Sequence, residues 1–382
     1  MRSYLPSSGN TRLLPLLLGV IALLLAMNLV ALALRSSTST AEEPANPAIL
    51  SNFHLPDSIS LCHEPIPLEN RKTLDMLDRE FTFAVWDRAQ VFMWLKRAGR
   101  YFPYIEEKLA EAEMPDDLKY VAVAESSLII EIKSRKRAVG LWQFMSRTAK
   151  RYGLRKNRLI DERLDFERST EAAIRYLQRL HNEFSSWTLA LAAYNCGDVF
   201  LKSEIKKQKV EDFYRLDLPL ETERYIFRIA AIKTIMENPK QYGFHLPAEH
   251  VYPPRWYDTV EVKISHPLKF TDLALSLDTD FKALKELNPQ FLRDYVPRGG
   301  YHIKVPPGFG PKVVVAVQKL GKGGAGERED ISGNHYVVRE GDTLGHISRR
   351  TGVSLATLKR INHIEGSTIW AGQKLHLMPS SN

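Results

Sequence analysis

One acidic side chain is placed where it could do chemistry. Glu125 closes the apolar segment V-A-V-A-E-S-S, which the spacing of its hydrophobic residues predicts to be helical. Burial and the negative end of the helix dipole both disfavour a carboxylate there, so we expect a raised pKa for Glu125. A glutamate that keeps its proton near neutral pH is suited to general acid catalysis. The alternative is a solvated glutamate at a helix end, which is the commoner case for an isolated residue.

Patterns for metal, phosphate or nucleophile chemistry are absent from the sequence. It contains no H-E-x-x-H, no Gly-rich phosphate loop and no G-x-S-x-G, and its 11 His are scattered. Cys62 and Cys196 are too few for a thiolate metal site, although a single bridge between them stays open. We therefore expect neither a metal nor a cofactor. A second carboxyl would come from Asp161, Glu162 or Asp165, whose pattern D-E-R-L-D-x-x-x-S-T favours turn and helix-start roles.

The composition indicates ordinary globular domains. The chain has 382 residues, of which 44% are hydrophobic and 26% charged, and this excludes collagen-like, wholly disordered and multi-span membrane classes. The length predicts two or three domains. The net charge of +8 favours polyanionic surroundings, which leaves nucleic acid, anionic lipid and cell-wall polymer open.

The N-terminus predicts export. Residues 1–12 contain Arg2 and Arg12, and residues 13–34 form an apolar run that could cross a hydrocarbon core about 30 Å thick. We favour an uncleaved membrane anchor; the alternative is a signal cleaved after Ala33 or Ala41. Residues 35–54 are small and polar and are expected to be a tether. Because the remainder would lie outside the cytoplasm, nucleic acid is a poor candidate partner.

The elements that position Glu125 are predicted to be helices. From about residue 79 to residue 244, apolar residues recur at three- and four-residue spacing, so residues 55–244 are interpreted as a compact all-α domain. One helix should begin near Pro115 and reach Glu125. A second is expected to be capped by Ser169 or Thr170, and two more should span residues 187–194 and 220–236.

The pattern changes after residue 254. Short strand-like pieces surround two short helical stretches in residues 255–307, and a second such unit follows a linker predicted at residues 308–333. DFKALKELN at 280–288 resembles SLATLKRIN at 354–362, which indicates a diverged repeat. The sequence thus predicts a multidomain chain, all-α first and then small β-α-α-β units of the α+β class.

The second of these units, residues 334–379, resembles the LysM module. The match rests on Y-V-V-R-E-G-D-T-L at its start, L-x-x-I-N in the middle and A-G-Q-K-L-H-L-M-P at its end. The resemblance implies binding to N-acetylglucosamine-containing glycans between the first helix and the loop after the second. Gly341, Asp342 and Thr343 are the candidate glycan contacts, with a turn and helix cap as the alternative. Residues 255–307 lack the G-D-T-L start and are interpreted as a degenerate LysM-like unit.

The helical domain resembles the soluble lytic transglycosylase family. The motifs are E-S at 125–126, Ser134, G-L-W-Q-F-M at 140–145, A-Y-N-x-G at 193–197 and E-T-x-x-Y at 221–225. With its LysM tail, the chain is similar to the membrane-bound D type of lytic murein transglycosylase. The resemblance implies a lysozyme-like fold and Glu125 as the catalytic acid. It also implies substrate-binding positions, which are Ser126, Ser134, Gln143, Met145, Tyr194, Asn195 and Tyr225.

The chemistry of these positions leaves some alternatives open. Gln143 and Asn195 could bond sugar hydroxyls and N-acetyl groups, and Tyr194 could orient the Glu125 carboxyl. Tyr225 lies mid-helix, where packing is nearly as good an explanation as catalysis. Trp142 and Phe144 have a strong alternative as core residues. The basic run at 133–137 is a solvated face, or else it meets stem-peptide carboxylates.

The resemblance implies cleavage of peptidoglycan without water. Glu125 would protonate the oxygen between N-acetylmuramic acid and N-acetylglucosamine and would then, as a base, activate the muramic C6 hydroxyl to leave a 1,6-anhydro end. The implied partner is the peptidoglycan glycan strand, and the implied location is the periplasm, at the membrane through residues 13–34. The alternatives are a lysozyme-like hydrolase, which typically needs a second carboxyl, and a non-catalytic peptidoglycan-binding scaffold.

Overall fold

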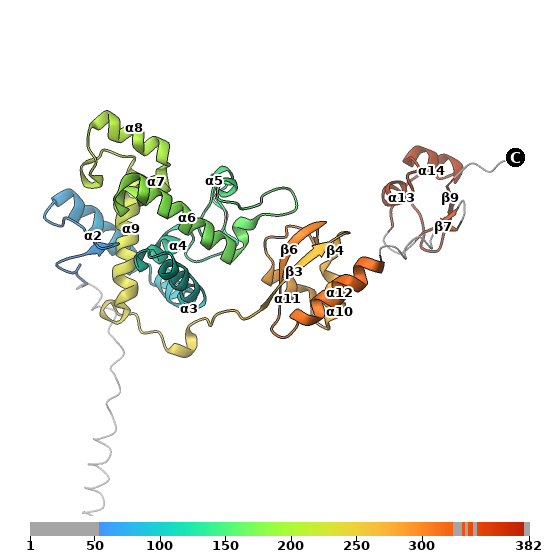
Figure 1. Cartoon of the computed structure of the whole chain (residues 1–382), viewed down its shortest axis with the longest axis horizontal. Coiled ribbons are helices and arrows are strands. Elements are labelled where there is room, and N and C mark those ends of the chain that lie inside the picture. Colours follow the sequence, from blue (N-terminus) through green and yellow to red (C-terminus); the bar gives the residue numbers. More distant parts are fainter. Residues whose placement is uncertain (1–52, 324–330, 333–334, 339–341, 378–382) are drawn as a thin grey trace, which may run out of the picture. The chain divides into compact units, whose positions relative to one another are not determined.

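The computed structural model describes residues 53–323, 331–332, 335–338 and 342–377 (Figure 1). None of the helices in these ranges is long and apolar enough to cross a membrane, and the anchor predicted at residues 13–34 lies outside them. Of the described residues, 53–56 group with Asn238–His245 as one compact unit, in which the rings of Phe53 and Tyr242 meet edge-on at 5.9 Å. The other described residues group as the second unit.

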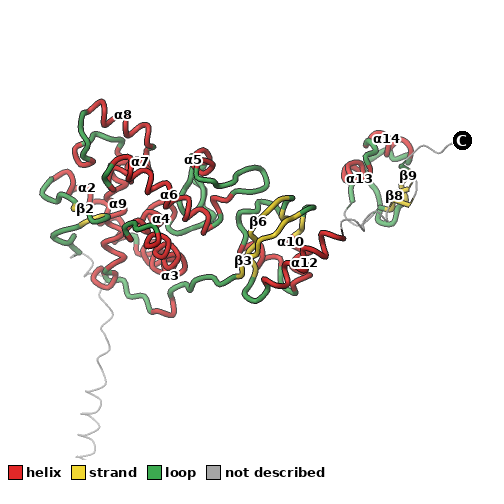
Figure 2. Tube along the Cα trace, in the orientation of Figure 1, coloured by secondary structure: helices red, strands yellow, loops and turns green. Residues whose placement is uncertain are grey.

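The helical domain is dominated by α-helices, with one small hairpin at its start (Figure 2). Its elements are β1 (Ser60–Leu61), β2 (Glu64–Pro65), α2 (Arg71–Trp86), α3 (Arg88–Glu111), η2 (Asp116–Leu118), α4 (Lys119–Ser126), α5 (Ser146–Arg151), η3 (Glu162–Leu164), α6 (Phe166–Phe184), α7 (Trp187–Cys196), α8 (Asp198–Gln208), η4 (Phe213–Arg215) and α9 (Leu220–Glu237). The 3-10 helices η5 (Pro239–Tyr242) and η6 (Ala248–His250) follow. The expected all-α domain is therefore present.

Helices α7 and α9 form the centre of this domain. Every residue of α7 from Trp187 to Ala193 is buried, and α9 is buried except along a stripe that contains Glu221, Arg224 and Arg228. A helix with so much buried apolar surface must be surrounded by protein on most sides, and α9 packs against α2, α4 and α7. Helix α4 therefore brings its C-terminal end against the middle of the domain, where the later motifs lie.

The predicted cap of α6 is wrong by one turn. The helix begins at Phe166, and its N-cap is Asp165, whose Oδ1 accepts from the N–H of Arg168 at 3.3 Å. Ser169 and Thr170 lie inside the first turns, and their hydroxyls donate to the carbonyl oxygen of Phe166. All three residue types can cap a helix; Asp165 takes the position because the preceding 3-10 turn ends there.

The first small unit has a β-α-α-β core. Strand β3 (Asp258–Ile264) pairs antiparallel with β6 (Gly299–Val305), and β4 (Leu268–Lys269) pairs with β5 (Tyr295–Val296). Between them lie α10 (Phe270–Leu277) and α11 (Phe281–Leu287). The linker predicted at 308–333 is wrong in its first half. Helix α12 (Gly310–Gly323) is there, because the buried side chains of Val313 and Ala316 complete this unit's core.

The second small unit follows the predicted order. Strands β7 (Ile331–Ser332), β8 (His335–Val337) and β9 (Lys374–His376) form one sheet, and α13 (Leu344–Thr351) and α14 (Leu355–Ile361) lie between β8 and β9. Thr343 and Ser354 cap the two helices, and Gly352 ends the first of them in a left-handed conformation. Tyr336, Leu344 and Leu375 are among the residues of a separate small core.

A carboxylate from the hairpin caps the buried helix α7. The Glu64 oxygens accept from the N–H groups of Trp187 (2.5 Å) and Thr188 (3.0 Å) and from the hydroxyls of Ser186 and Thr188 (both 3.1 Å). Negative charge at a helix N-terminus satisfies orphan donors and complements the dipole. The hairpin thus fixes the helix that carries the A-Y-N motif.

We predict that Glu64→Ala lowers the free energy of unfolding by about 2 kcal/mol, because it leaves buried amide groups unpaired. Urea denaturation measures this change. The control is Glu69→Ala, an exposed glutamate of the same segment, which should stay within about 0.5 kcal/mol of the wild type. Equal effects of the two substitutions would contradict the capping role.

Candidate active site

Glu125 lies on the last turn of α4, at a tight change of chain direction. The helix ends at Ser126, and Ser127 and Leu128 both have positive φ angles of 52° and 58°. Two side chains of α3 hold this turn: Gln90 donates to the Ser127 hydroxyl, and Arg97 donates to its carbonyl oxygen at 2.9 Å. The turn fixes where the Glu125 side chain starts.

A tyrosine from α9 holds the Glu125 carboxyl. The Tyr225 hydroxyl donates to Oε1 of Glu125 at 2.7 Å. Burial is the main cause that raises the pKa of Glu125 to about 7, while the hydrogen bond from Tyr225 and the charge of Arg228 oppose it and the charge of Glu221 adds to it. The expected raised pKa is confirmed in direction, and Glu125 can therefore both give and take a proton near neutral pH.

Sequence reasoning missed the cation beside this pair. Arg228 lies one helical turn after Tyr225 on α9, and its guanidinium donates to Glu221 (3.1 Å) and Glu80 (3.4 Å). A spacing of three residues on a helix places two side chains on neighbouring surface. The R-Y-x-x-R pattern of α9 was therefore the signal that could have found Arg228.

Tyr194 has a different partner from the one predicted. Its hydroxyl donates to the carbonyl oxygen of Trp142 at 2.7 Å, so the hydrogen bond to Glu125 comes from Tyr225 instead. Burial and the charge of Glu125 raise the pKa of Tyr194, and the same two causes raise that of Tyr225. Both phenols therefore stay protonated and act as hydrogen-bond donors. The Tyr194 hydroxyl ties α7 to the loop at residues 140–145.

The two later motifs contact each other through Asn195. Its Oδ1 accepts from the Thr222 hydroxyl at 3.0 Å, so A-Y-N-x-G on α7 is linked to E-T-x-x-Y on α9. Cys196 and Cys62 are both free thiols, and the bridge that the sequence left open is not formed.

The loop before α5 is held by its own polar groups. The Ser134 hydroxyl accepts from the N–H of Ala138 at 3.0 Å and closes the turn that carries the basic run. Gln143 has a positive φ of 46°, and its side-chain amide donates to the carbonyl oxygens of Gly140 (2.8 Å) and Ile132 (3.3 Å). Both side chains therefore shape this loop.

The remaining predicted residues differ in accessibility. Met145 is 47% exposed at the start of α5, so it is available to a ligand. Ser126 is buried, and its hydroxyl donates back to the carbonyl oxygen of Ala122 within the helix. Trp142 and Phe144 are core residues, and the Trp142 indole donates to the Thr170 hydroxyl at 3.0 Å.

The three candidate second carboxyls are buried in ion pairs. Asp161 binds Arg163 at 2.6 Å, Glu162 binds Arg155 at 2.7 Å and Asp165 binds Lys304 at 3.1 Å. Asp161 and Asp165 also cap η3 and α6, so the turn and helix-start interpretation is confirmed. Within the described ranges, no group of three His, Cys, Asp or Glu side chains could hold a metal ion.

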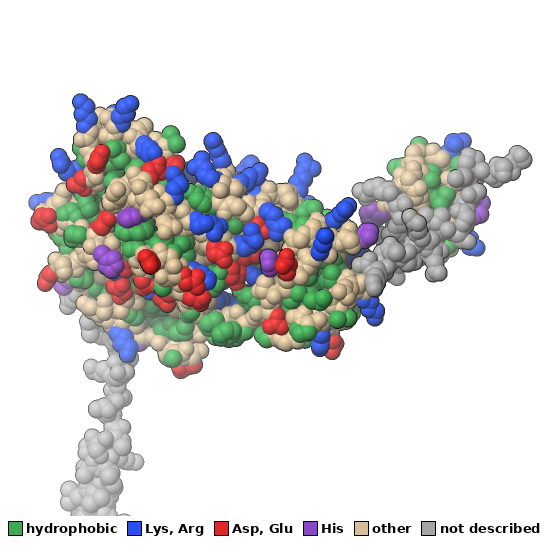
Figure 3. All heavy atoms as spheres, in the orientation of Figure 1, with side chains coloured by type: hydrophobic (Ala, Val, Ile, Leu, Met, Phe, Trp, Pro, Cys, Tyr) green, Lys and Arg blue, Asp and Glu red, His purple; other side chains and the backbone are tan. Residues whose placement is uncertain are grey.

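The basic run is exposed. Lys133, Arg135, Lys136 and Arg137 are solvent-accessible. On the face of the molecule drawn in Figure 3, Lys and Arg side chains project along the upper edge of the view.

In the second small unit, Asp342 accepts from the Tyr336 hydroxyl at 2.7 Å, and Thr343 caps α13. Gly341 lies outside the described residues. The turn-and-cap alternative therefore accounts for the described members of that motif.

Family comparisons assign the three domains. Residues 102–216 match the Transglycosylase SLT domain, residues 258–320 match the LysM-like domain of the lytic transglycosylase MltD, and residues 336–377 match the LysM domain. The chain is thus a lysozyme-like, helix-rich SLT domain followed by two units of the LysM type.

Three relatives match different shares of this chain. The chain is 30% identical over 300 residues to membrane-bound lytic murein transglycosylase D from two strains of Escherichia coli, which covers 75% of this chain. It spans 65% of the length of those relatives. It is also 29% identical over 153 residues to a putative tributyltin chloride resistance protein from Alteromonas, across 38% of this chain and 74% of that protein.

Among solved structures, lytic transglycosylase Slt from Pseudomonas aeruginosa, in an inactive mutant form, aligns with a TM-score of 0.29 and 15% identity. The alignment covers 40% of this chain and 26% of that one.

We predict that Glu125→Gln stabilises the protein in a pH-dependent way. Because the folded-state pKa of about 7 lies above the unfolded value, ionising Glu125 costs stability as pH rises from about 4.5 to 7. The neutral variant escapes this cost, so it should gain about 3 kcal/mol at pH 8 and less than about 1 kcal/mol at pH 5. Urea unfolding at both pH values measures the difference. Glu131→Gln, at an exposed position, is the control; a pH-independent gain in Glu125→Gln would count against the buried carboxyl.

Proposed function

We propose that this chain is a peptidoglycan lytic transglycosylase that uses Glu125 first as an acid and then as a base. The supporting observation is one carboxyl with a pKa of about 7, held by a tyrosine hydroxyl at 2.7 Å on an SLT-domain scaffold. Such a group is protonated in a large fraction of molecules at neutral pH and can still accept a proton afterwards.

The reaction proceeds in two proton transfers. Glu125 donates its proton to the glycosidic oxygen between N-acetylmuramic acid and N-acetylglucosamine, and the bond to the muramic anomeric carbon breaks with assistance from the N-acetyl group. The Glu125 carboxylate then takes the proton from the muramic C6 hydroxyl, whose oxygen bonds to the anomeric carbon. The products are a 1,6-anhydromuramoyl end and a free 4-hydroxyl, and no water is consumed. Tyr225 donates to the carboxylate between the two steps.

The residues around Glu125 supply the binding surface. Gln143, Met145 and Asn195 are proposed to contact the sugars, with Ser126 and Ser134 shaping the backbone beside them. The basic run at 133–137 would attract the carboxylates of stem peptides. Gly341, Asp342 and Thr343 form the proposed glycan-binding start of the LysM unit. The protein would act on the cell-wall side of the membrane, to which residues 13–34 attach it.

A lysozyme-like hydrolase is the alternative on the same scaffold, and substitution of Glu221 tests it. Retaining and inverting hydrolases typically use a second carboxyl about 5 to 9.5 Å from the acid. Glu221 is the carboxylate that raises the pKa of Glu125, and it is paired with Arg228. Asp161, Glu162 and Asp165 are engaged in ion pairs of their own.

We predict that the wild type releases anhydromuropeptides from purified peptidoglycan and that Glu125→Gln lowers this rate by at least 1,000-fold, because the proton donor is lost. Glu221→Gln should keep more than about a tenth of the rate and the same products. Mass spectrometry of the soluble fragments decides the question. Fragments heavier by one water that disappear in Glu221→Gln would identify a hydrolase, and pelleting with the wall without products would identify a scaffold.

We predict that Tyr225→Phe shifts the pH profile of kcat. The Tyr225 hydrogen bond stabilises the carboxylate and lowers the pKa of Glu125, so its removal should move the alkaline limb to higher pH and lower kcat at the optimum by about 10- to 100-fold. The variant Tyr194→Phe, which removes the bond to Trp142, should lower the rate with a smaller shift. An unshifted limb in Tyr225→Phe would refute the role of its hydroxyl.

A further inference from the structure

Main-chain hydrogen bonds join the helical domain to the first LysM-like unit. A short segment before α6 lies antiparallel to the loop that follows α11. The N–H of Leu292 donates to the carbonyl oxygen of Leu159, and the N–H of Asp161 donates to that of Gln290, both at 2.9 Å. Between these bonds, Ile160 is paired with Phe291. The two segments thus form an isolated antiparallel β-bridge between the two domains. The contact around this bridge is the seam between the domains.

The two domains also share a hydrophobic core at this seam. Ile160 is 3% exposed, and its side chain belongs to the same cluster as Phe291, Val296 and Ile303 of the LysM-like unit. The helical domain therefore supplies a side chain to the interior of its neighbour. A domain that lacks its partner at such a place would expose an apolar hole.

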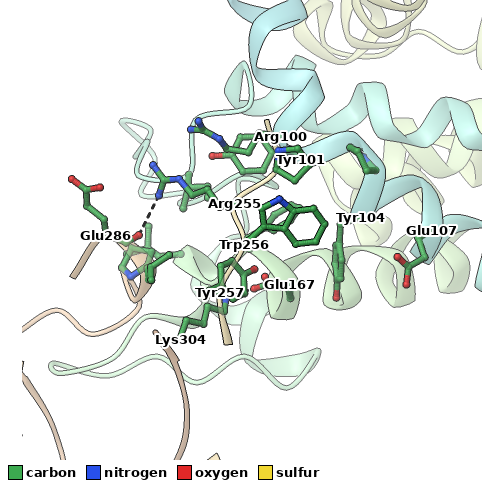
Figure 4. A pocket seen from close by; sticks show the side chains of 17 residues that line it. Arg100, Tyr101, Tyr104, Glu107, Glu167, Arg255, Trp256, Tyr257, Glu286 and Lys304 are labelled. Atoms are coloured by element: carbon green, nitrogen blue, oxygen red, sulfur yellow. Dashed lines mark hydrogen bonds and ion pairs between the residues drawn. The ribbon is translucent and has the colours of Figure 1, made fainter. Parts of the chain in front are cut away.

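Buried ion pairs lie beside this shared core. Lys304 on β6 is 6% exposed, and its ammonium binds Asp165, the cap of α6, at 3.1 Å and also Glu167. Figure 4 shows Lys304 and Glu167 close together at one end of a cavity of about 270 Å³, with Trp256 and Tyr104 farther along it. Buried charges of opposite sign depend on one another, so loss of Lys304 would leave the carboxylates of Asp165 and Glu167 without this cation.

The same segment reaches the loop beside Glu125 through one arginine. Arg163, which is 3% exposed, is held by both carboxylate oxygens of Asp161 at 2.8 and 2.6 Å. Its Nη1 donates to the carbonyl oxygens of Phe144 (2.8 Å) and Arg137 (3.1 Å). A Cβ on Gly140 would lie 2.0 Å from the carbonyl oxygen of Arg163, so this loop packs directly on the Arg163 backbone.

We propose that the first LysM-like unit is a buttress for the active-site loop at residues 134–145, and that Arg163 is the positioning residue through which it acts. The path runs from the loop after α11 to Asp161, from Asp161 to Arg163, and from Arg163 to the carbonyl groups on both sides of Gly140. That loop carries Gln143, and its Trp142 carbonyl oxygen accepts the hydrogen bond from Tyr194.

This assignment separates the two LysM-type units. The LysM resemblance places glycan between the first helix and the loop after the second helix. In the first unit, the loop after the second helix is bonded to Leu159 and Asp161 of the helical domain. That edge therefore contacts the helical domain of the same chain, and we assign glycan binding to the second unit. The effect on turnover rests on the proposed function; the effect on loop structure does not.

The test compares three variants of the full chain. Arg163→Lys keeps the charge but loses the fork that reaches Asp161 and two carbonyl oxygens, and Lys304→Met removes the seam cation. Lys282→Met is the control, because Lys282 lies on α11 with its side chain 85% exposed. The measurements are kcat and KM for release of anhydromuropeptides, pelleting with purified peptidoglycan, and hydrogen exchange of the amides in residues 134–145.

We expect Arg163→Lys and Lys304→Met to lower kcat by at least tenfold, with KM and pelleting within twofold of the wild type. Amide exchange in residues 134–145 should rise at least tenfold, whereas exchange in α7 and α9 stays unchanged. Lys282→Met should match the wild type in all three measurements.

Three results would overturn the proposal. Loss of pelleting in Lys304→Met with kcat unchanged would make the unit a glycan binder. Unchanged amide hydrogen exchange in residues 134–145 would show that the first LysM-like unit does not stabilise this loop. Faster exchange throughout the helical domain in both variants would show that the seam supports the whole fold and not this loop. Absence of products from the wild type refutes the proposed function instead, and the exchange measurement still tests the buttress.

Discussion

The burial of one carboxyl among three helices is the constraint on which the site depends. Glu125 is brought to the centre of the domain by α4, where α9 supplies Tyr225 and the cation of Arg228. Desolvation at this site disfavours the carboxylate form and raises the pKa of Glu125. Here the tyrosine hydroxyl and the nearby guanidinium moderate it, so the pKa settles near 7 and not far above it. The buried residues of α4, α7 and α9 are mostly apolar, while Glu221, Arg224 and Arg228 form a partly exposed polar stripe on α9.

The supports of the site come from widely separated parts of the chain. Glu64 caps α7 from the N-terminal hairpin, Gln90 and Arg97 of α3 hold the turn after Glu125, and Arg163 holds the loop before α5. Glu64, Arg97 and Arg163 satisfy backbone groups that would otherwise lack a partner, and Gln90 donates to the side-chain hydroxyl of Ser127. At the seam with the first LysM-like unit, main-chain bonds and the Lys304 ion pairs follow the same rule, whereas the buried Oε1 of Gln290 beside them has no hydrogen-bond partner.

The two LysM-type units differ in how their hydrophobic cores are completed. The second unit has its own small core around Tyr336, Leu358 and Leu375. The core of the first unit is completed by α12 and by Ile160 of the helical domain. Its sequence lacks the G-D-T-L start that marks the second unit, which agrees with a structural role for the first. The prediction of a linker is wrong at residues 310–323 for a related reason. An amphipathic helix near glycines is hard to distinguish from a tether until the core that it covers is known.

The sequence by itself determined the domain order, the helical class of the first domain and the approximate ends of α4, α7 and α9, and it singled out Glu125 as the candidate acid. These follow from local patterns: hydrophobic periodicity, capping residues, and motifs whose members are close along the chain. The tertiary structure alone decided which tyrosine meets Glu125. Tyr194 and Tyr225 both belong to recognised motifs, and only the packing of α9 against α4 gives the bond to Tyr225 and leaves Tyr194 to the Trp142 carbonyl. The seam through Ile160 and Lys304 was likewise invisible, because hydrogen bonds and ion pairs between residues more than 100 positions apart leave no local periodicity in a single sequence.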